Sequence, residues 1–140
     1  MYYLVEWNET QNDKQGTLDV TFDIKEGSSS DSNILQLPKT PAGYTITEQS
    51  INDSSCIIVY GDSNQNQIIY AQSNDIKNMS ISIDNEDADF NETIINGCKG
   101  YTSTKDGINA LYWADSNCFY ELQGTCEMDV LHSMTKSIYR

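Results

Sequence analysis

Residues 90–122 read FNETIINGCKGYTSTKDGINALYWADSNCFYEL, and this stretch decides the expected fold. It holds four short strand-like segments, separated by the turns Asn96-Gly97, Asp106-Gly107 and Asp115-Ser116-Asn117. Asn-Gly and Asp-Gly favour hairpin turns because both residues tolerate a positive φ. The pattern therefore predicts an antiparallel meander of four strands, at residues 90–96, 99–104, 108–113 and 118–122.

The upstream part of the chain shows the same kind of pattern. Residues 17–24 alternate apolar and polar side chains, which predicts a strand with one buried and one wet face. Residues 8–16 are polar and are expected to link this strand to a first one in a loose hairpin. Further strands are expected at residues 3–7, 44–50, 56–60, 67–72 and 79–83.

The last segment changes from a strand-like to a helical period. After Gly124, apolar residues recur at Met128, Leu131, Met134 and Ile138, which is helical spacing. We expect Thr125 to be the N-cap of this helix, since threonine is a favoured capping residue.

The fold class that follows is α+β, with a curved antiparallel β-sheet and a C-terminal α-helix packed on one face. We expect a single domain over residues 1–140, because domains commonly hold about 100–150 residues. Residues 1–40 would form an N-terminal hairpin and loop that lead into a core at residues 41–138.

The charge of the chain excludes several classes of partner. It has 8 Lys and Arg against 21 Asp and Glu, so its formal net charge is -13. This charge argues against nucleic acid, which binds through phosphate-neutralising basic patches, and against docking on anionic lipid. No run approaches the roughly 20 apolar residues of a membrane helix, and the first residues have no signal-peptide pattern.

The four cysteines are Cys56, Cys98, Cys118 and Cys126. They form no C-x-x-C pair and the chain has one histidine, so the close spacing of a structural zinc site is missing. Three disulfide pairings are conceivable, and the spacing does not choose among them. We favour Cys56 and Cys118 as small core residues over any disulfide, since each stands beside apolar residues.

The acidic segment 84–92 holds five carboxylates, which could bind calcium through hard oxygen ligands. The candidate ligands are Asp84, Glu86, Asp87 and Asp89. The EF-hand pattern fails, because Glu92 stands where its turn glycine is needed and Cys98 where its bidentate glutamate is needed. We therefore favour a solvated acidic loop over a calcium site and expect no cofactor.

No sequence signature of catalysis occurs in the chain. It has no Gly-x-Ser-x-Gly elbow, no glycine-rich phosphate loop and no zinc-binding His-Glu-x-x-His. His132 falls in the expected helix, where a surface position is commoner than a catalytic one. We expect no enzyme and assign no catalytic residue.

Aromatic side chains are frequent on the expected strands. They could line a concave sheet face that binds an apolar ligand, but strand aromatics also pack sheets without any ligand, and we favour that interpretation. The candidate ligand-binding residues are Tyr44, Tyr60, Tyr70, Tyr112, Trp113 and Tyr120.

The order of motifs from residue 41 onward resembles a known bacterial family. The motifs read PAGYTITE at residues 41–48, INGCKGY at 95–101, LYWAD at 111–115 and YELQG at 120–124. This order resembles the family called domain of unknown function 4367. The resemblance implies the extracytoplasmic end of a single-span membrane protein of Gram-positive bacteria, in some cases with an anti-sigma-like cytoplasmic part. It implies no catalytic residues.

Two functions are expected on this basis. The first is a non-enzymatic extracytoplasmic sensor or protein-interaction domain at the cell surface, tethered by an N-terminal membrane helix outside this chain. The alternative is a carrier-type domain that binds a lipid or other apolar ligand on an aromatic sheet face. The partner would be an unknown protein or a small apolar ligand, with no nucleic acid, and the membrane would be reached only through the tether. An acid/base hydrolase at the acidic segment ranks last.

Overall fold

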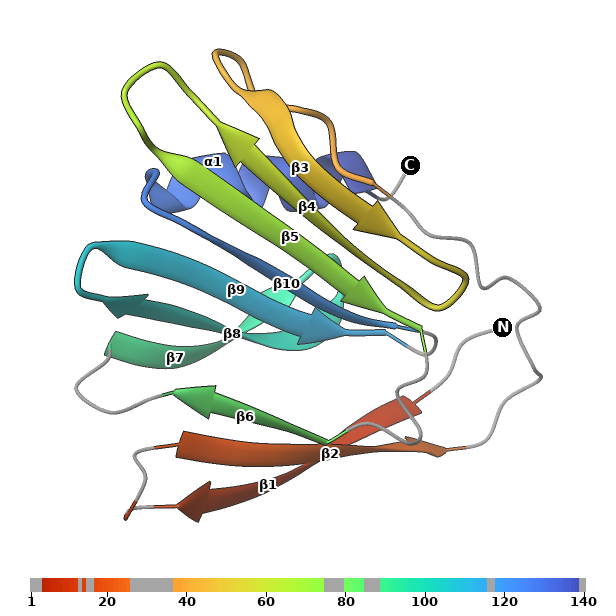
Figure 1. The fold of residues 1–140 in the computed structure, drawn as a ribbon. Coiled ribbons are helices and arrows are strands. Elements are labelled where there is room, and N and C mark those ends of the chain that lie inside the picture. The colour runs from red at the N-terminus through yellow and green to blue at the C-terminus, as the bar shows by residue number, and fades with distance from the viewer. Residues whose placement is uncertain are drawn as a thin grey trace.

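A computed structural model describes residues 4–12, 14, 17–25, 37–74, 80–84, 89–115 and 118–138. Two antiparallel sheets and one helix, α1 (Met128–Ile138), make up the described fold (Figure 1). The smaller sheet has the order β1-β2-β6, formed by β1 (Leu4–Asn12), β2 (Thr17–Lys25) and β6 (Ser80–Asp84). The larger sheet has the order β3-β4-β5-β10-β9-β8-β7, formed by β3 (Thr45–Ile51), β4 (Ser55–Gly61), β5 (Gln67–Ser73), β7 (Asp89–Ile95), β8 (Cys98–Lys105), β9 (Ile108–Ala114) and β10 (Phe119–Gly124).

The meander from β7 to β10 confirms the fold class expected from residues 90–122. Successive strands pair antiparallel, and the two predicted hairpin dipeptides form the first two turns. Asn96 and Gly97 have φ values of 52° and 82°, and Asp106 and Gly107 have 54° and 79°. Two consecutive positive φ angles are what a type I′ hairpin turn requires.

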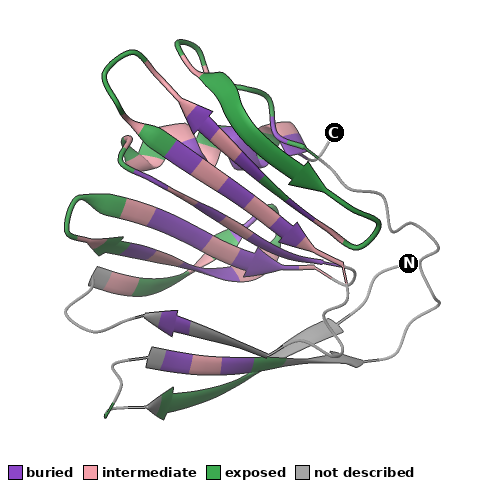
Figure 2. Cartoon of the chain, in the orientation of Figure 1, coloured by how far each residue is buried: buried purple, intermediate pink, exposed green. Residues whose placement is uncertain are grey.

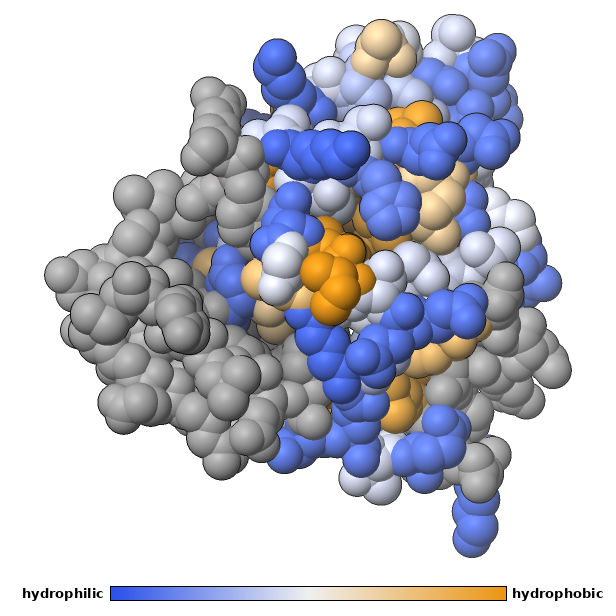
Figure 3. Space-filling model, turned by 180° about the vertical axis from the view of Figure 1, so that it is seen from behind, coloured by the Kyte–Doolittle hydropathy of each residue, from blue (hydrophilic) through white to orange (hydrophobic). Residues whose placement is uncertain are grey.

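The helix α1 lies on one face of the larger sheet, as expected, behind it in the view of Figure 1. Leu131, Met134 and Ile138 are buried against the sheet. On the α1 side of the molecule, hydrophilic residues predominate on the surface and the hydrophobic areas are small and separate (Figure 3). No helix in the described ranges is long and apolar enough to cross a membrane.

The expected N-cap at Thr125 is wrong. The backbone N–H of Thr125 donates to the carbonyl oxygen of Gln67 at 3.1 Å, so this residue, directly after β10, is still bonded to β5. Its hydroxyl accepts a hydrogen bond from the Gln67 N–H and donates one to Asn66 Oδ1. The Val130 N–H donates to the Glu127 carbonyl oxygen, and the helix begins at Met128. Pairing with β5 therefore delays the start of the helix.

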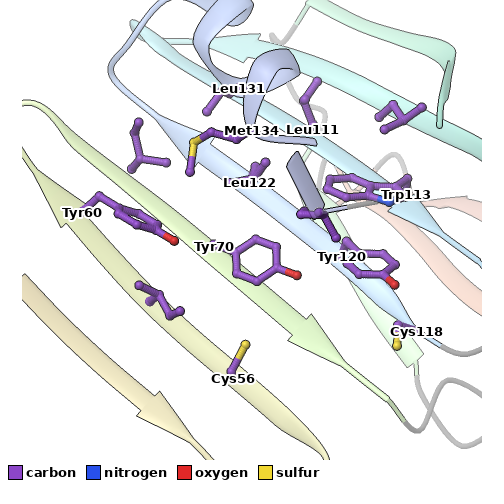
Figure 4. Packing of buried hydrophobic residues seen from close by; sticks show 14 residues of the cluster. Cys56, Tyr60, Tyr70, Leu111, Trp113, Cys118, Tyr120, Leu122, Leu131 and Met134 are labelled. Atoms are coloured by element: carbon purple, nitrogen blue, oxygen red, sulfur yellow. The ribbon is translucent and has the colours of Figure 1, made fainter. Parts of the chain in front are cut away.

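The main core fills the space between α1 and the larger sheet (Figure 4). Buried and partly exposed residues alternate along β4 and β5, because successive side chains point to opposite faces of a sheet (Figure 2). The largest fully buried side chains of this core are Trp113, Tyr60, Tyr70, Ile58, Ile68, Leu111, Leu122 and Leu131.

A second core lies on the opposite face of the larger sheet, where the smaller sheet packs. It joins Leu18 and Val20 of β2 and Ile83 of β6 to buried residues of the larger sheet, namely Tyr101, Ala114 and Phe119. The N-terminal hairpin was expected, but its separate sheet with β6 was not. The expected loop at residues 8–16 is also shorter, because β1 continues to Asn12 and pairs it with Thr17. Exposed polar residues at positions 8–11 are compatible with this edge strand.

Candidate functional site

Four of the six candidate aromatic residues lie in the main core. Tyr60, Tyr70, Trp113 and Tyr120 are each at most 2% exposed. The rings of Trp113 and Tyr120 stack at 4.8 Å between centroids (Figure 4). The Tyr70 hydroxyl donates to Gln72 Oε1 at 2.8 Å, so this polar group has a partner inside the fold. These four side chains belong to the same buried cluster as Leu131, Met134 and Ile138 of the helix, so they pack the core.

The other two candidate aromatics lie in different places. Tyr44 is partly buried and packs against the main core. Tyr112 points to the opposite face of the sheet and packs against the second core. The fold therefore does not bring the six predicted residues together on one surface.

The acidic segment is described only in part. Glu86 and Asp87 lie outside the described residues, while Asp84 ends β6 and Asp89 begins β7. Within the ranges that the structure describes, no group of three His, Cys, Asp or Glu side chains is placed to hold a metal ion. The calcium hypothesis for this segment stays a prediction.

The cysteines are free thiols, and Cys56 and Cys118 are buried as expected. These two lie on either side of β5, because Cys56 pairs with Gln72 and Phe119 pairs with Ser73 (Figure 4). Two strand spacings are about 9.5 Å, which exceeds the Cα separation of roughly 7 Å that a disulfide can bridge.

The thiols of Cys118 and Cys98 are poor nucleophiles at neutral pH. Burial, and then the charge of Asp115, raise the pKa of Cys118 to about 11. The same two causes raise the pKa of Cys98 to about 11. Since the thiolate is the reactive form of cysteine, neither thiol is activated.

An open apolar strip occupies the face of the larger sheet opposite α1, over β4 and β5. Ile57 pairs with Ala71, and Val59 pairs with Ile69. Ile57 is 52% exposed and the other three are partly exposed. The smaller sheet covers side chains of β8, β9 and β10 on this face, and the second core that it forms includes no residue of β4 or β5. We call Ile57, Val59, Ile69 and Ala71 the open strip.

Glu121 of β10 stands where the open strip meets the second core. It pairs with Ala71 of β5 on one side and with Tyr112 of β9 on the other. Its carboxylate makes no hydrogen bond or ion pair within the described part of the chain, and burial raises its pKa. The sequence analysis missed this residue, because a glutamate between Tyr120 and Leu122 has the pattern of a solvent-facing strand position.

The family comparison agrees with the motifs seen in the sequence. The model of the domain of unknown function DUF4367 matches residues 34–138, three quarters of the chain. The chain belongs to the DUF4367 family. No curated protein and no solved structure matches it.

The DUF4367 match covers the larger sheet and the helix but leaves out the N-terminal hairpin. The matched region runs from before β3 to the end of α1, so it includes the open strip, Glu121 and the main core. The hairpin of β1 and β2 precedes it, yet β2 supplies Leu18 and Val20 to the second core. In this DUF4367 chain, the second core therefore combines residues from outside the matched region with Ile83 of β6 from inside it.

Proposed function

We propose that this DUF4367 domain is a non-enzymatic extracytoplasmic sensor or interaction domain of a membrane-anchored bacterial protein, and that it binds an extended segment of a partner protein over the open strip. The observation that carries the proposal is the exposure of Ile57, at 52%, among partly exposed apolar neighbours on a sheet face of which the smaller sheet covers only the part over β8, β9 and β10. Apolar surface left uncovered beside a packed core is typical of interaction sites.

The edge of the sheet beside the strip supports an extended partner. β3 pairs with β4 on one side only, and all seven of its residues are exposed (Figure 2). Edge strands present unpaired backbone groups to which another chain can add a strand. Ser50 of β3 pairs with Ile57, so β3 would lie between a strand added at this edge and the open strip.

The carrier-type alternative has less support. It was based on an aromatic sheet face, and Tyr60, Tyr70, Trp113 and Tyr120 are buried in the main core instead. The acidic surface and the family's extracytoplasmic context are compatible with either function. The open strip consists of aliphatic side chains from two strands, which suits an extended segment whose alternate side chains point at the sheet.

Selection from a random library of 12-residue peptides displayed on phage tests the proposal. Peptides that the domain enriches are synthesised, and their affinities are measured for the wild type, for Ile57→Glu and for Ile94→Glu. Ile94 is 66% exposed on β7, so the second variant is a matched control. We expect Ile57→Glu to lose at least about tenfold in affinity, since it places a charge in an apolar contact, while Ile94→Glu keeps the wild-type value.

Two results would contradict the proposal. One is that no peptide is enriched, or that the enriched peptides bind Ile57→Glu as tightly as the wild type. The other is a lipid that co-purifies with the domain in native mass spectrometry and is lost in Ile57→Glu, which would favour a carrier.

A further inference from the structure

We infer that Glu121 selects the partner by charge, so that the segment bound on the open strip places a lysine or arginine side chain against this carboxylate. The inference rests on the proposed function and specifies the chemistry of its partner. It is based on the position of Glu121 in the sheet, on its lack of a partner and on the composition of its surroundings.

The position follows from the strand register. Ile57, Ala71, Glu121 and Tyr112 are paired in turn across β4, β5, β10 and β9, so their side chains form one row on the face opposite α1. Neighbouring strands are about 4.8 Å apart. Glu121 is therefore about two strand spacings from Ile57, at the inner end of the strip and beside the residues covered by the smaller sheet.

The lack of a partner distinguishes Glu121 from Glu9, another acidic group on this side of the molecule. Glu9 of β1 receives hydrogen bonds from Lys99 at 2.9 Å and from Tyr101 at 2.6 Å. Lys99, two residues from Tyr101 on β8, is therefore already engaged. Glu121 has no such hydrogen bond or ion pair from the residues described. A partly buried carboxylate without a counter-charge is costly, and a cation from outside the chain would offset that cost.

The residues around Glu121 favour a cation at the end of a long apolar side chain. A lysine or arginine has an apolar stem that can lie along aliphatic side chains while its charged head reaches a carboxylate. Ala71 has a small side chain next to Glu121, which leaves room over the sheet for such a stem. The net charge of -13 also attracts basic segments at long range.

The charge selection is tested with the same 12-residue phage library, panned in parallel on the wild type, Glu121→Gln and Glu127→Gln. Glu127 is exposed and lies just before α1, so its variant changes the net charge equally without touching the strip. We expect the peptides enriched on the wild type and on Glu127→Gln to carry a Lys or Arg at a fixed place in an apolar pattern. Glu121→Gln should enrich the same apolar pattern without the basic residue.

One enriched peptide is then synthesised with its basic residue and with norleucine in its place. For the wild type, the norleucine peptide should bind at least about tenfold more weakly than the peptide with the basic residue. For Glu121→Gln, the affinities of the two peptides should differ less than twofold. If Glu121→Gln enriched Lys and Arg as strongly as the wild type does, the inference would be overturned, because the net charge of the domain would then explain the preference for basic residues. Failure of the proposed function is distinguishable, since peptides would then be insensitive to Ile57→Glu as well.

Discussion

The hydroxyl of Tyr101 donates a hydrogen bond to Glu9 Oε1 at 2.6 Å, across 92 residues of sequence. The other oxygen of the same carboxylate accepts a hydrogen bond from Lys99 at 2.9 Å. The ring of Tyr101 stacks on Phe90, with 4.8 Å between centroids, above the second core. Burial and the hydrogen bond to Glu9 raise the pKa of Tyr101, so the hydroxyl remains a donor at neutral pH. This contact links β1 of the N-terminal hairpin to β8 of the larger sheet, which lies within the region matched by the family model.

Replacing Tyr101 with phenylalanine should destabilise the fold. A hydrogen bond to a charged group contributes about 1.5–3 kcal/mol, and we expect a loss of this size in the free energy of unfolding in urea. A double-mutant cycle with Glu9→Gln measures the coupling directly. Strictly additive effects of the two substitutions would show that the contact does not contribute.

Replacing Gly100 with alanine should strain the sheet. A Cβ atom there would lie 2.5 Å from the Tyr112 carbonyl oxygen and 2.9 Å from Trp113 Cβ, and neither atom can move aside cheaply. Overpacking of this kind costs about 1–3 kcal/mol of unfolding free energy. Gly61→Ala is the control, because its Cβ would meet a side-chain methyl of Thr47 at 3.2 Å. Equal urea midpoints for the two variants would contradict the prediction.

The thiols should resist modification in the folded protein. At pH 8, raising the pKa of Cys118 from 9.0 to about 11 lowers its thiolate fraction about a hundredfold, and burial restricts access as well. We expect slow reaction with Ellman's reagent in buffer and four free thiols in urea. An intact mass 2 Da below that of the reduced chain, after purification without reductant, would reveal a disulfide and contradict the four free thiols of the structure.

Glu121 should make stability depend on pH. Burial raises its pKa above the ordinary value of 4.5, so the folded state binds the proton more tightly than the unfolded state. The free energy of unfolding therefore falls as the pH rises from about 4.5 through the folded pKa. Glu121→Gln removes this loss, so we expect it to raise Tm at pH 7 and to have little effect at pH 4.

The exposed residue Glu127 provides the control for the change in net charge. Glu127→Gln changes the net charge by the same amount, and we expect Glu121→Gln to raise Tm at pH 7 by more than this variant does. A Glu121→Gln variant whose Tm follows the wild type at both pH values would show that burial of this carboxylate costs nothing.

Local patterns predicted most of the secondary structure. The meander from β7 to β10 depends on turns whose residues are adjacent in the sequence, so Asn96-Gly97 and Asp106-Gly107 were sufficient to predict it. The pairing of β5 with β10 joins residues about fifty positions apart, and no local signal specifies it. The same pairing holds Thr125 in the sheet, which explains why its assignment as a helix cap was wrong.

The candidate site was less predictable than the strands. The aromatic residues were correctly placed on strands, but which face α1 would cover depends on the packing of the whole sheet. Glu121 has the sequence pattern of a solvent-facing residue, and only its register with Ala71 and Tyr112 shows that it is partly buried.

The sequence by itself determined the antiparallel meander, the C-terminal helix, the acidic surface and membership of the family. These properties follow from turn dipeptides, side-chain periodicity and charge, which act over a few residues or are simple sums. Only the tertiary structure decided that the smaller sheet covers one half of a face and leaves the open strip beside Glu121. The reason is that burial depends on which segments, distant along the chain, compete to cover the same apolar surface.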